Sequence, residues 1–359
     1  MKKEIRITRQ SNFELLRIIS ILMIIMHHYA YYVNQNCKVI GFALNNIVID
    51  FLYIGGKIGV TIFVLIAGYF GIKSEFKTKK LIKLLLEVLF YSLIFLIIDI
   101  IINGINSINI DLIKKSLFPI TFSLYWFATT YIILYALSPF INKLINGLNL
   151  KDVRKLLLIL IMFIYILPTI TNKGMGLGNV DIFITLYILG AYIRLKDSDK
   201  SNKNYLIYFV LCIIFIIAMQ LLCEWKNMNK YINYFASMNN ITVLISSVSL
   251  FMYFKNINIQ SELINKIASI TFGVYLIHSN YFMHRFIWGK LFNNTKYYIS
   301  NDYKIIIHAS FSILATYIIC VLIDLFRIYC IEKWALPTIY KFCNLFKNKV
   351  IQKLDKIKR

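Results

Sequence analysis

The chain has 359 residues, of which 59% are hydrophobic and 16% are charged, and its mean hydropathy is +0.66. A soluble domain of this length cannot hide so much apolar surface, so the composition excludes a soluble globular protein. The net charge of +23 invites a nucleic-acid interpretation. However, the Lys and Arg residues lie in short clusters between apolar runs, whereas a nucleic-acid-binding domain gathers them on one surface.

Ten apolar segments are each near the length of about 20 residues that crosses a bilayer as a helix. The sixth segment is short, and the ninth is interrupted by polar residues. No small-residue cleavage site follows the first segment, so we expect a helix there rather than a signal peptide. The segments lie at 13–33, 47–70, 82–102, 124–142, 155–171, 180–195, 204–223, 236–254, 267–288 and 304–326.

After Ile331, apolar residues alternate with Lys, a pattern typical of an amphipathic helix at the membrane surface followed by a basic tail. We therefore divide the chain into a transmembrane domain, 1–330, and an interfacial helix with a basic cytoplasmic tail, 331–359. The predicted fold class is all-α, a polytopic integral membrane protein of about ten helices.

The basic residues between the segments predict the orientation. With the N-terminus in the cytoplasm, 28 of the 40 Lys and Arg residues lie in inner segments and 10 in outer loops, while Arg17 and Lys57 lie within spans. Cytoplasmic loops of membrane proteins carry such an excess. An odd number of spans would place the basic tail outside, so the asymmetry favours an even number with both ends inside.

The first apolar segment carries ionisable residues, which are costly in a membrane unless they are paired or face a wet cavity. Glu14 and Arg17 are three residues apart and can pair. Arg17 and His28 are eleven residues apart. This corresponds to about 1100° of helical rotation, only about 20° from whole turns, so the two residues lie on one face and are separated by about 16 Å along the axis. His27 points about 80° or more away from this face. The structural alternative is that Arg17 snorkels inward and His28 only bonds a neighbouring helix.

Other segments carry further candidate site residues. Lys57 lies near the outer end of the second segment. It either has a functional role or simply extends its ammonium group to the membrane surface. Trp126 and Tyr131 form either a pocket wall or part of an interfacial aromatic belt. His278 ends the run TFGVYLIH, at inner-to-middle depth. The run GVTIFVLIAGYF, 59–70, has small residues that favour close helix packing.

The remaining polar residues indicate no further site. Glu87 and Asp99 lie near opposite ends of the third segment and are interpreted as interfacial, and His284 lies near an outer helix end. Cys37 and Cys223 fall in outer loops, where their pairing stays open. No HExxH run, Cys/His cluster or carboxylate pair has metal-ligand spacing, so we expect no metal.

Four motifs in chain order resemble acyltransferase family 3, the integral-membrane acyltransferases that O-acylate cell-surface glycans. That family opens with an acidic residue, an Arg three residues later and a His at the end of the first apolar run. Here Glu14, Arg17 and His28 match this pattern. The run GVTIFVLIAGYF resembles the family's second helix, which closes on Ser-Gly-Tyr, with Ala67 in place of the Ser and Tyr69 as the Tyr.

The other two motifs follow later in the chain. YWFATTYIILYALSPFIN resembles the family's Tyr-Trp-Phe helix ending in Pro139, and TFGVYLIH resembles its late Tyr-x-x-His helix. The likeness covers residues 11–325. The family's basic Arg-x-Arg element after the second helix is replaced by lysines at 73, 77, 79 and 80.

The resemblance implies transfer of an acyl group, most often acetyl, from cytosolic acyl-CoA to a hydroxyl of a surface or exported polysaccharide. The setting would be a bacterial plasma membrane. The partners would be acyl-CoA, the glycan and the lipid bilayer, with no nucleic acid, metal or permanently bound cofactor. His28 would act as general base or carry the acyl group itself, and Arg17, supported by Glu14, would meet the CoA phosphates. Further candidates for binding donor or acceptor are Lys57, Tyr69, Trp126, Tyr131 and His278.

Two other functions stay open. A glycan exporter or flippase would need a continuous polar path through the bundle but no acyl donor. A non-catalytic structural or sensor protein would lose only stability when Arg17 or His28 is replaced.

Overall fold

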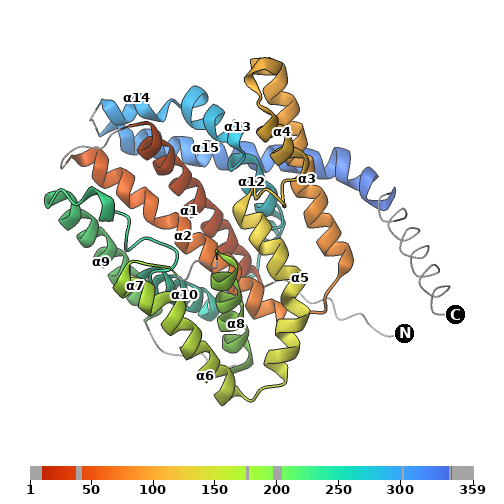
Figure 1. The fold of residues 1–359 in the computed structure, drawn as a ribbon, viewed down its shortest axis with the longest axis vertical. Helices are drawn as coiled ribbons and strands as arrows, with labels where there is room; N and C mark the ends of the chain where they lie inside the picture. The colour runs from red at the N-terminus through yellow and green to blue at the C-terminus, as the bar shows by residue number, and fades with distance from the viewer. Residues whose placement is uncertain are drawn as a thin grey trace.

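The computed structural model describes residues 10–37, 43–174, 178–196, 204–300, 303–338 and 341. Within these residues all regular structure is helical (Figure 1), so the all-α class is confirmed. Seven of the described helices are long and apolar enough to cross a membrane. They are α1 (Ser11–Asn36), α2 (Leu44–Gly71), α3 (Thr78–Asn103), α5 (Trp126–Asn146), the run Leu150–Thr171, α9 (Tyr205–Trp225) and the run Lys304–Thr338.

Several of these runs contain more than one element. Leu150–Thr171 comprises α6 (Leu150–Ile161), the π-helical turn η2 (Met162–Ile166) and α7 (Leu167–Thr171). Lys304–Thr338 begins with α15 (Lys304–Arg327) and the π-helical turn η5 (Ile328–Glu332). Short helices lie between the long ones: η1 (Ile105–Ser107), α4 (Ile110–Leu117), η3 (Asn229–Tyr231), α11 (Glu262–Ala268) and α14 (Asn294–Ile299).

The other three predicted segments are helical but shorter. The sixth is α8 (Val180–Lys196), and the eighth is α10 (Ile241–Asn256), which starts later than expected because the side chain of Asn240 caps it. The ninth is broken into three helices. They are α12 (Thr271–His278), α13 (Tyr281–Arg285) and the π-helical turn η4 (Phe286–Leu291). The count of ten spans therefore stays a prediction.

Helices α1 and α2 run side by side through the middle of the bundle, with α8 and α10 packed against α2 (Figure 1). Glycines let these helices approach closely. A Cβ on Gly59 would come 2.5 Å from the Ser20 carbonyl oxygen of α1. A Cβ on Gly68 would come 2.1 Å from the Tyr187 carbonyl oxygen of α8. Both glycines belong to the run 59–70, so the predicted tight packing is confirmed.

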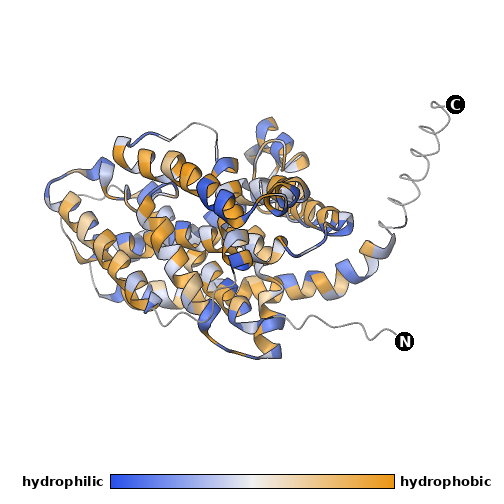
Figure 2. Ribbon diagram, turned by 90° about the horizontal axis from the view of Figure 1, so that it is seen from below, coloured by the Kyte–Doolittle hydropathy of each residue, from blue (hydrophilic) through white to orange (hydrophobic). Residues whose placement is uncertain are grey.

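The outer surface of the bundle is apolar where a soluble protein would be polar. Along α15, one face presents Ile307, Phe311, Leu314, Ile318 and Leu322, each more than half exposed. Figure 2 shows apolar residues along the lengths of the helices. A continuous stripe of this kind is stable against lipid and unstable against water, which fits a multi-pass membrane protein.

The helical run that starts at Lys304 extends to Thr338 and includes the π-helical turn η5 at Ile328–Glu332. The remainder of the predicted basic tail lies outside the described residues, apart from Lys341, and the division at 330 stays a prediction. Cys37 and Cys223 both carry free thiols in this structure.

Candidate functional site

A partly open cavity of 1520 Å³ lies on one side of the bundle. It is formed by the carboxyl-terminal halves of α1 and α3, the amino-terminal halves of α2 and α5, helix α4, and the broken α12–α13 region. Its wall is mostly polar and aromatic. The residues of the wall include His27, His28, Tyr31, Tyr53, Lys57, Asp99, Asp111, Lys115, Trp126, His284, Arg285 and Lys290.

Three histidines from distant parts of the chain meet at this cavity. The ring centroid of His28, on α1, lies 4.9 Å from that of His278 and 5.5 Å from that of His284. His28 and His284 line the cavity, whereas His278 is fully buried behind His28. The Nδ1 atom of His28 is buried and has no hydrogen-bond partner. Buried polar atoms in proteins are usually hydrogen-bonded, so this unpaired nitrogen marks His28 as a candidate functional residue.

The tautomer of His278 follows from its hydrogen bonds. Its Nδ1 lies 2.6 Å from the carbonyl oxygen of Val274. Because a carbonyl oxygen only accepts, Nδ1 of His278 carries the proton and Nε2 offers a lone pair. The hydroxyl of Ser279 lies 3.4 Å from that Nε2, which is a long contact. His278 therefore offers Nε2 as an acceptor, and its ring centroid lies 4.9 Å from that of His28.

The break between α12 and α13 has a local cause. The side-chain oxygen of Asn280 accepts from the backbone N–H of Phe282 at 3.0 Å and so caps α13. Its amide nitrogen donates to the hydroxyl of Tyr125 at 2.7 Å. The break turns the chain after His278 and brings His284 back toward His28.

His27 has a different environment from His28. Its Nδ1–H donates to the carbonyl oxygen of Tyr53 at 2.8 Å, and its ring packs on Gly56, where a Cβ would come 2.3 Å from the ring. These contacts tie α1 to α2, although His27 also reaches the cavity wall. The different directions predicted for the two histidines thus correspond to different contacts in the structure.

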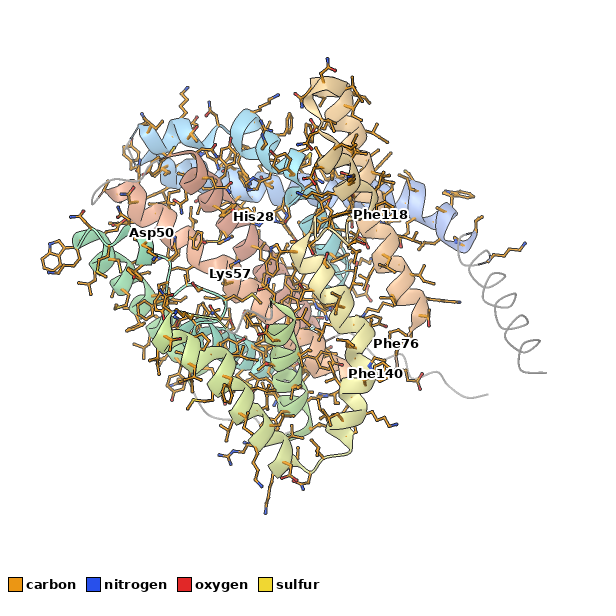
Figure 3. All side chains as sticks on the ribbon, viewed as in Figure 1. His28, Asp50, Lys57, Phe76, Phe118 and Phe140 are labelled. Carbon is orange, nitrogen blue, oxygen red and sulfur yellow. The ribbon has the colours of Figure 1, made fainter. Side chains whose placement is uncertain are left out.

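Lys57 and Trp126 come together at the cavity. The ammonium nitrogen of Lys57 lies 5.0 Å from the centroid of the Trp126 ring, and both residues line the wall. Figure 3 labels His28 and Lys57 on the neighbouring helices α1 and α2. Lys57 is half-buried and forms no ion pair with a described carboxylate.

Arg17 forms the pair with Glu14 that their spacing allows. Its Nη1 lies 2.8 Å and 2.9 Å from the two carboxylate oxygens of Glu14. Arg17 does not line the cavity, which agrees with the axial separation of about 16 Å from His28. The cavity wall therefore includes the His28 end of the shared face of α1 and does not extend to Arg17.

The structure places two predicted residues away from the cavity. The hydroxyl of Tyr69 accepts from Arg194 at 2.9 Å, near the opposite end of α2. Tyr131 stacks on Phe127 with their ring centroids 5.9 Å apart. Neither tyrosine lines the cavity wall, so neither can contact a molecule bound there without rearrangement.

Sequence reasoning missed His284. Asp99, which the sequence places near the end of the third segment, also lines the cavity, and its carboxylate accepts from Asn103 at 2.6 Å. His284 was assigned only to a helix end. The sequence does contain a signal for its position. Asn280 is a strong N-cap residue inside the interrupted ninth segment, and it predicts that a new helix starts after His278.

No group of three or more His, Cys, Asp or Glu side chains among the described residues is arranged to hold a metal ion. A comparison with protein families matches residues 10–325 to a family described as an acyltransferase domain. Neither curated proteins nor solved structures gave a match.

Proposed function

Because the chain belongs to the acyltransferase 3 family over residues 10–325, we propose that it transfers an acyl group, most often acetyl, from cytosolic acyl-CoA to a hydroxyl of a surface or exported glycan. The observation that carries the proposal is His28 in the wall of a polar cavity of 1520 Å³. This volume exceeds the roughly 300–1,000 Å³ of most small-molecule sites, so it accommodates several sugar units.

The proposed orientation has both ends in the cytoplasm of a bacterial plasma membrane. Its support is the excess of basic residues in the inner segments. In this orientation the cavity faces outward, since it lies at the carboxyl-terminal end of α1. The acceptor is then proposed to reach His28 from outside through this cavity, and the donor to bind from the cytoplasmic side at Arg17, which lies outside the cavity wall.

Labelling of single cysteines tests this orientation. In a cysteine-free background, Lys114→Cys on α4 is expected to react with a membrane-impermeant maleimide on intact cells, because it lies on the outer side. Lys151→Cys, at the start of α6, is expected to react only after permeabilisation. Both positions are exposed in the structure, so accessibility within the fold does not differ between them. The reverse labelling pattern would contradict the orientation.

In the proposed reaction, a neutral His28 takes the proton of the sugar hydroxyl through Nε2. The sugar oxygen attacks the thioester carbonyl carbon, the C–S bond breaks, and CoA leaves as a thiolate that recovers the proton. An alternative path first forms acyl-His28 with release of CoA, and the sugar oxygen then displaces the imidazole. In both paths the acyl carbon gains a C–O bond and loses the C–S bond.

His278 fits a positioning role in this reaction. Its Nε2 lone pair is available, and the buried Nδ1 of His28 has no partner. A bond from the His28 Nδ1–H to the His278 Nε2 would fix the tautomer of His28 and leave its own Nε2 as the base. The separation of 4.9 Å between the two ring centroids is short enough for such a bond.

Arg17 is proposed to bind the phosphates of acyl-CoA, because the rest of its guanidinium stays available while Nη1 pairs with Glu14. Arg17→Lys keeps the charge but loses the planar fork, so we expect a raised KM for acyl-CoA with a smaller effect on kcat. Glu14→Gln is the control for loss of the ion pair alone. Unchanged binding of labelled acyl-CoA by Arg17→Ala membranes would assign Arg17 a structural role.

The function itself is tested by measuring ester-linked acyl groups on envelope glycans of cells with and without the protein. The acyltransferase proposal predicts that the glycans persist while their O-acyl groups disappear. Loss of the surface glycan itself would support the exporter alternative. Unchanged glycan and unchanged ester content would support the non-catalytic alternative.

A further inference from the structure

We infer that the acceptor is an anionic glycan, with phosphate or carboxylate groups near the hydroxyl that is acylated. The inference rests on the proposed function and on the charges in the cavity wall. The wall carries two more cations than carboxylates. The cations are Lys57, Lys115, Arg285 and Lys290, and the carboxylates are Asp99 and Asp111.

Both carboxylates already have partners within the protein. Lys115 lies 2.7 Å from Asp111 on the same helix, α4. Asn103 donates to Asp99 at 2.6 Å. The other three cations form no ion pair with a carboxylate among the described residues. The cavity therefore has an excess of positive charge that the protein itself does not neutralise.

Lys57 carries the strongest part of the argument. It is a half-buried cation in a membrane-spanning helix, where an uncompensated charge is costly and usually marks a functional site. The Trp126 ring, whose centroid lies 5.0 Å from the ammonium nitrogen, offsets part of this cost through a cation–π contact. An anionic group bound at Lys57 would supply the missing charge. The sugar that carries this group would then lie in the same cavity as His28.

Membrane insertion does not explain these cations. In the proposed orientation, Lys115, Arg285 and Lys290 belong to outer loops, where the rule that governs insertion depletes Lys and Arg. They nevertheless gather around one cavity. A cleft lined by one sign of charge concentrates ligands of the opposite sign. The arrangement fits recruitment of a polyanion from the outer surface.

The first test uses the natural acceptor in cells that produce the protein. Their envelope glycans are separated by anion-exchange chromatography into acidic and neutral fractions, with and without the gene for this chain. We expect ester-linked acyl groups to be lost from the acidic fraction. Loss from the neutral fraction alone would overturn the inference and leave the proposed function standing. No loss from either fraction would contradict the proposed function, and the inference with it.

The second test uses variants of the full chain. Lys57→Gln is expected to lower acylation of the acidic fraction by about tenfold, the size of one lost hydrogen bond to a charged group. Lys57→Arg should recover much of it, because the cation remains. The matched control is Lys173→Gln, which removes an exposed cation outside the cavity and should have no effect.

A further variant covers the case in which Lys57→Gln does not accumulate in the membrane. Arg285→Gln with Lys290→Gln changes two exposed residues of the cavity wall, so the fold should persist. This double variant should acylate the acidic fraction several-fold less than the unchanged chain. The difference between the two should become smaller at high salt, because salt screens exposed charges. Full acylation by both the Lys57→Gln and the double variants would overturn the inference.

Discussion

His28→Ala is expected to lower acyl transfer by about 10²–10⁴-fold, the usual cost of losing a general base. The side chain lines the cavity and has a buried Nδ1 without a partner, so the fold does not depend on its hydrogen bonds. The variant protein should therefore still accumulate in the membrane. The measurement is ester formation on envelope glycans, normalised to the amount of protein in the membrane fraction.

His27→Ala is the matched control because it removes the neighbouring imidazole from the same helix. It loses the bond to the Tyr53 carbonyl and leaves a space beside Gly56, so it should reduce stability while keeping much of the activity. Normal acylation by stably accumulating His28→Ala would end the general-base proposal and favour the exporter alternative.

Arg327→Met is expected to destabilise the protein by about 3–5 kcal/mol, because breaking a buried ion pair leaves uncompensated charge. The guanidinium of Arg327 lies 2.9 Å from Glu87, 2.7 Å from Asp324 and 2.6 Å from Glu332, and the arginine side chain is buried. The variant should give a lower unfolding temperature in detergent and less protein in the membrane. The readout is thermal unfolding followed by size-exclusion chromatography.

Lys155→Met provides the control, since it removes an exposed pair with Asp152 at 3.4 Å that is worth at most about 1 kcal/mol. Arg327→Met combined with Glu87→Gln should recover part of the loss, because one unpaired charge is then removed. An Arg327→Met protein as stable as the unchanged chain would show that the network does not hold the fold together.

This network also bears on the candidate site. Asp324 lies directly against Gly273 of α12, where a Cβ would come 2.1 Å from the carboxyl group. Glu87, near one end of α3, is buried in the ion pair with Arg327. The ion pair between Arg327 and Glu87 therefore joins α15 to α3, Asp324 packs α15 against α12, and α12 ends on His278. A loss of this network should disturb the packing behind His28 as well as stability.

The sequence by itself determined the features that depend on local chemistry. Runs of apolar residues have to be helical in a bilayer, because an unsatisfied backbone group is too costly there, and the predicted segments are all mainly helical. The 3.6-residue period placed Glu14, Arg17 and His28 on one face, and the structure has the Glu14–Arg17 ion pair. The motifs that follow led to the family, which the match over residues 10–325 confirms.

Only the tertiary structure decided which distant residues meet. His28 and His284 are 256 positions apart in the sequence, and their contact depends on the helix break at Asn280. Tyr69 lies twelve residues beyond Lys57 on α2, which is about 18 Å along the helix axis, so it packs with Arg194 and stays apart from Lys57 and Trp126. A helix fixes the face on which a residue lies. What that face meets depends on side-chain packing between helices, which the periodicity of one segment does not encode.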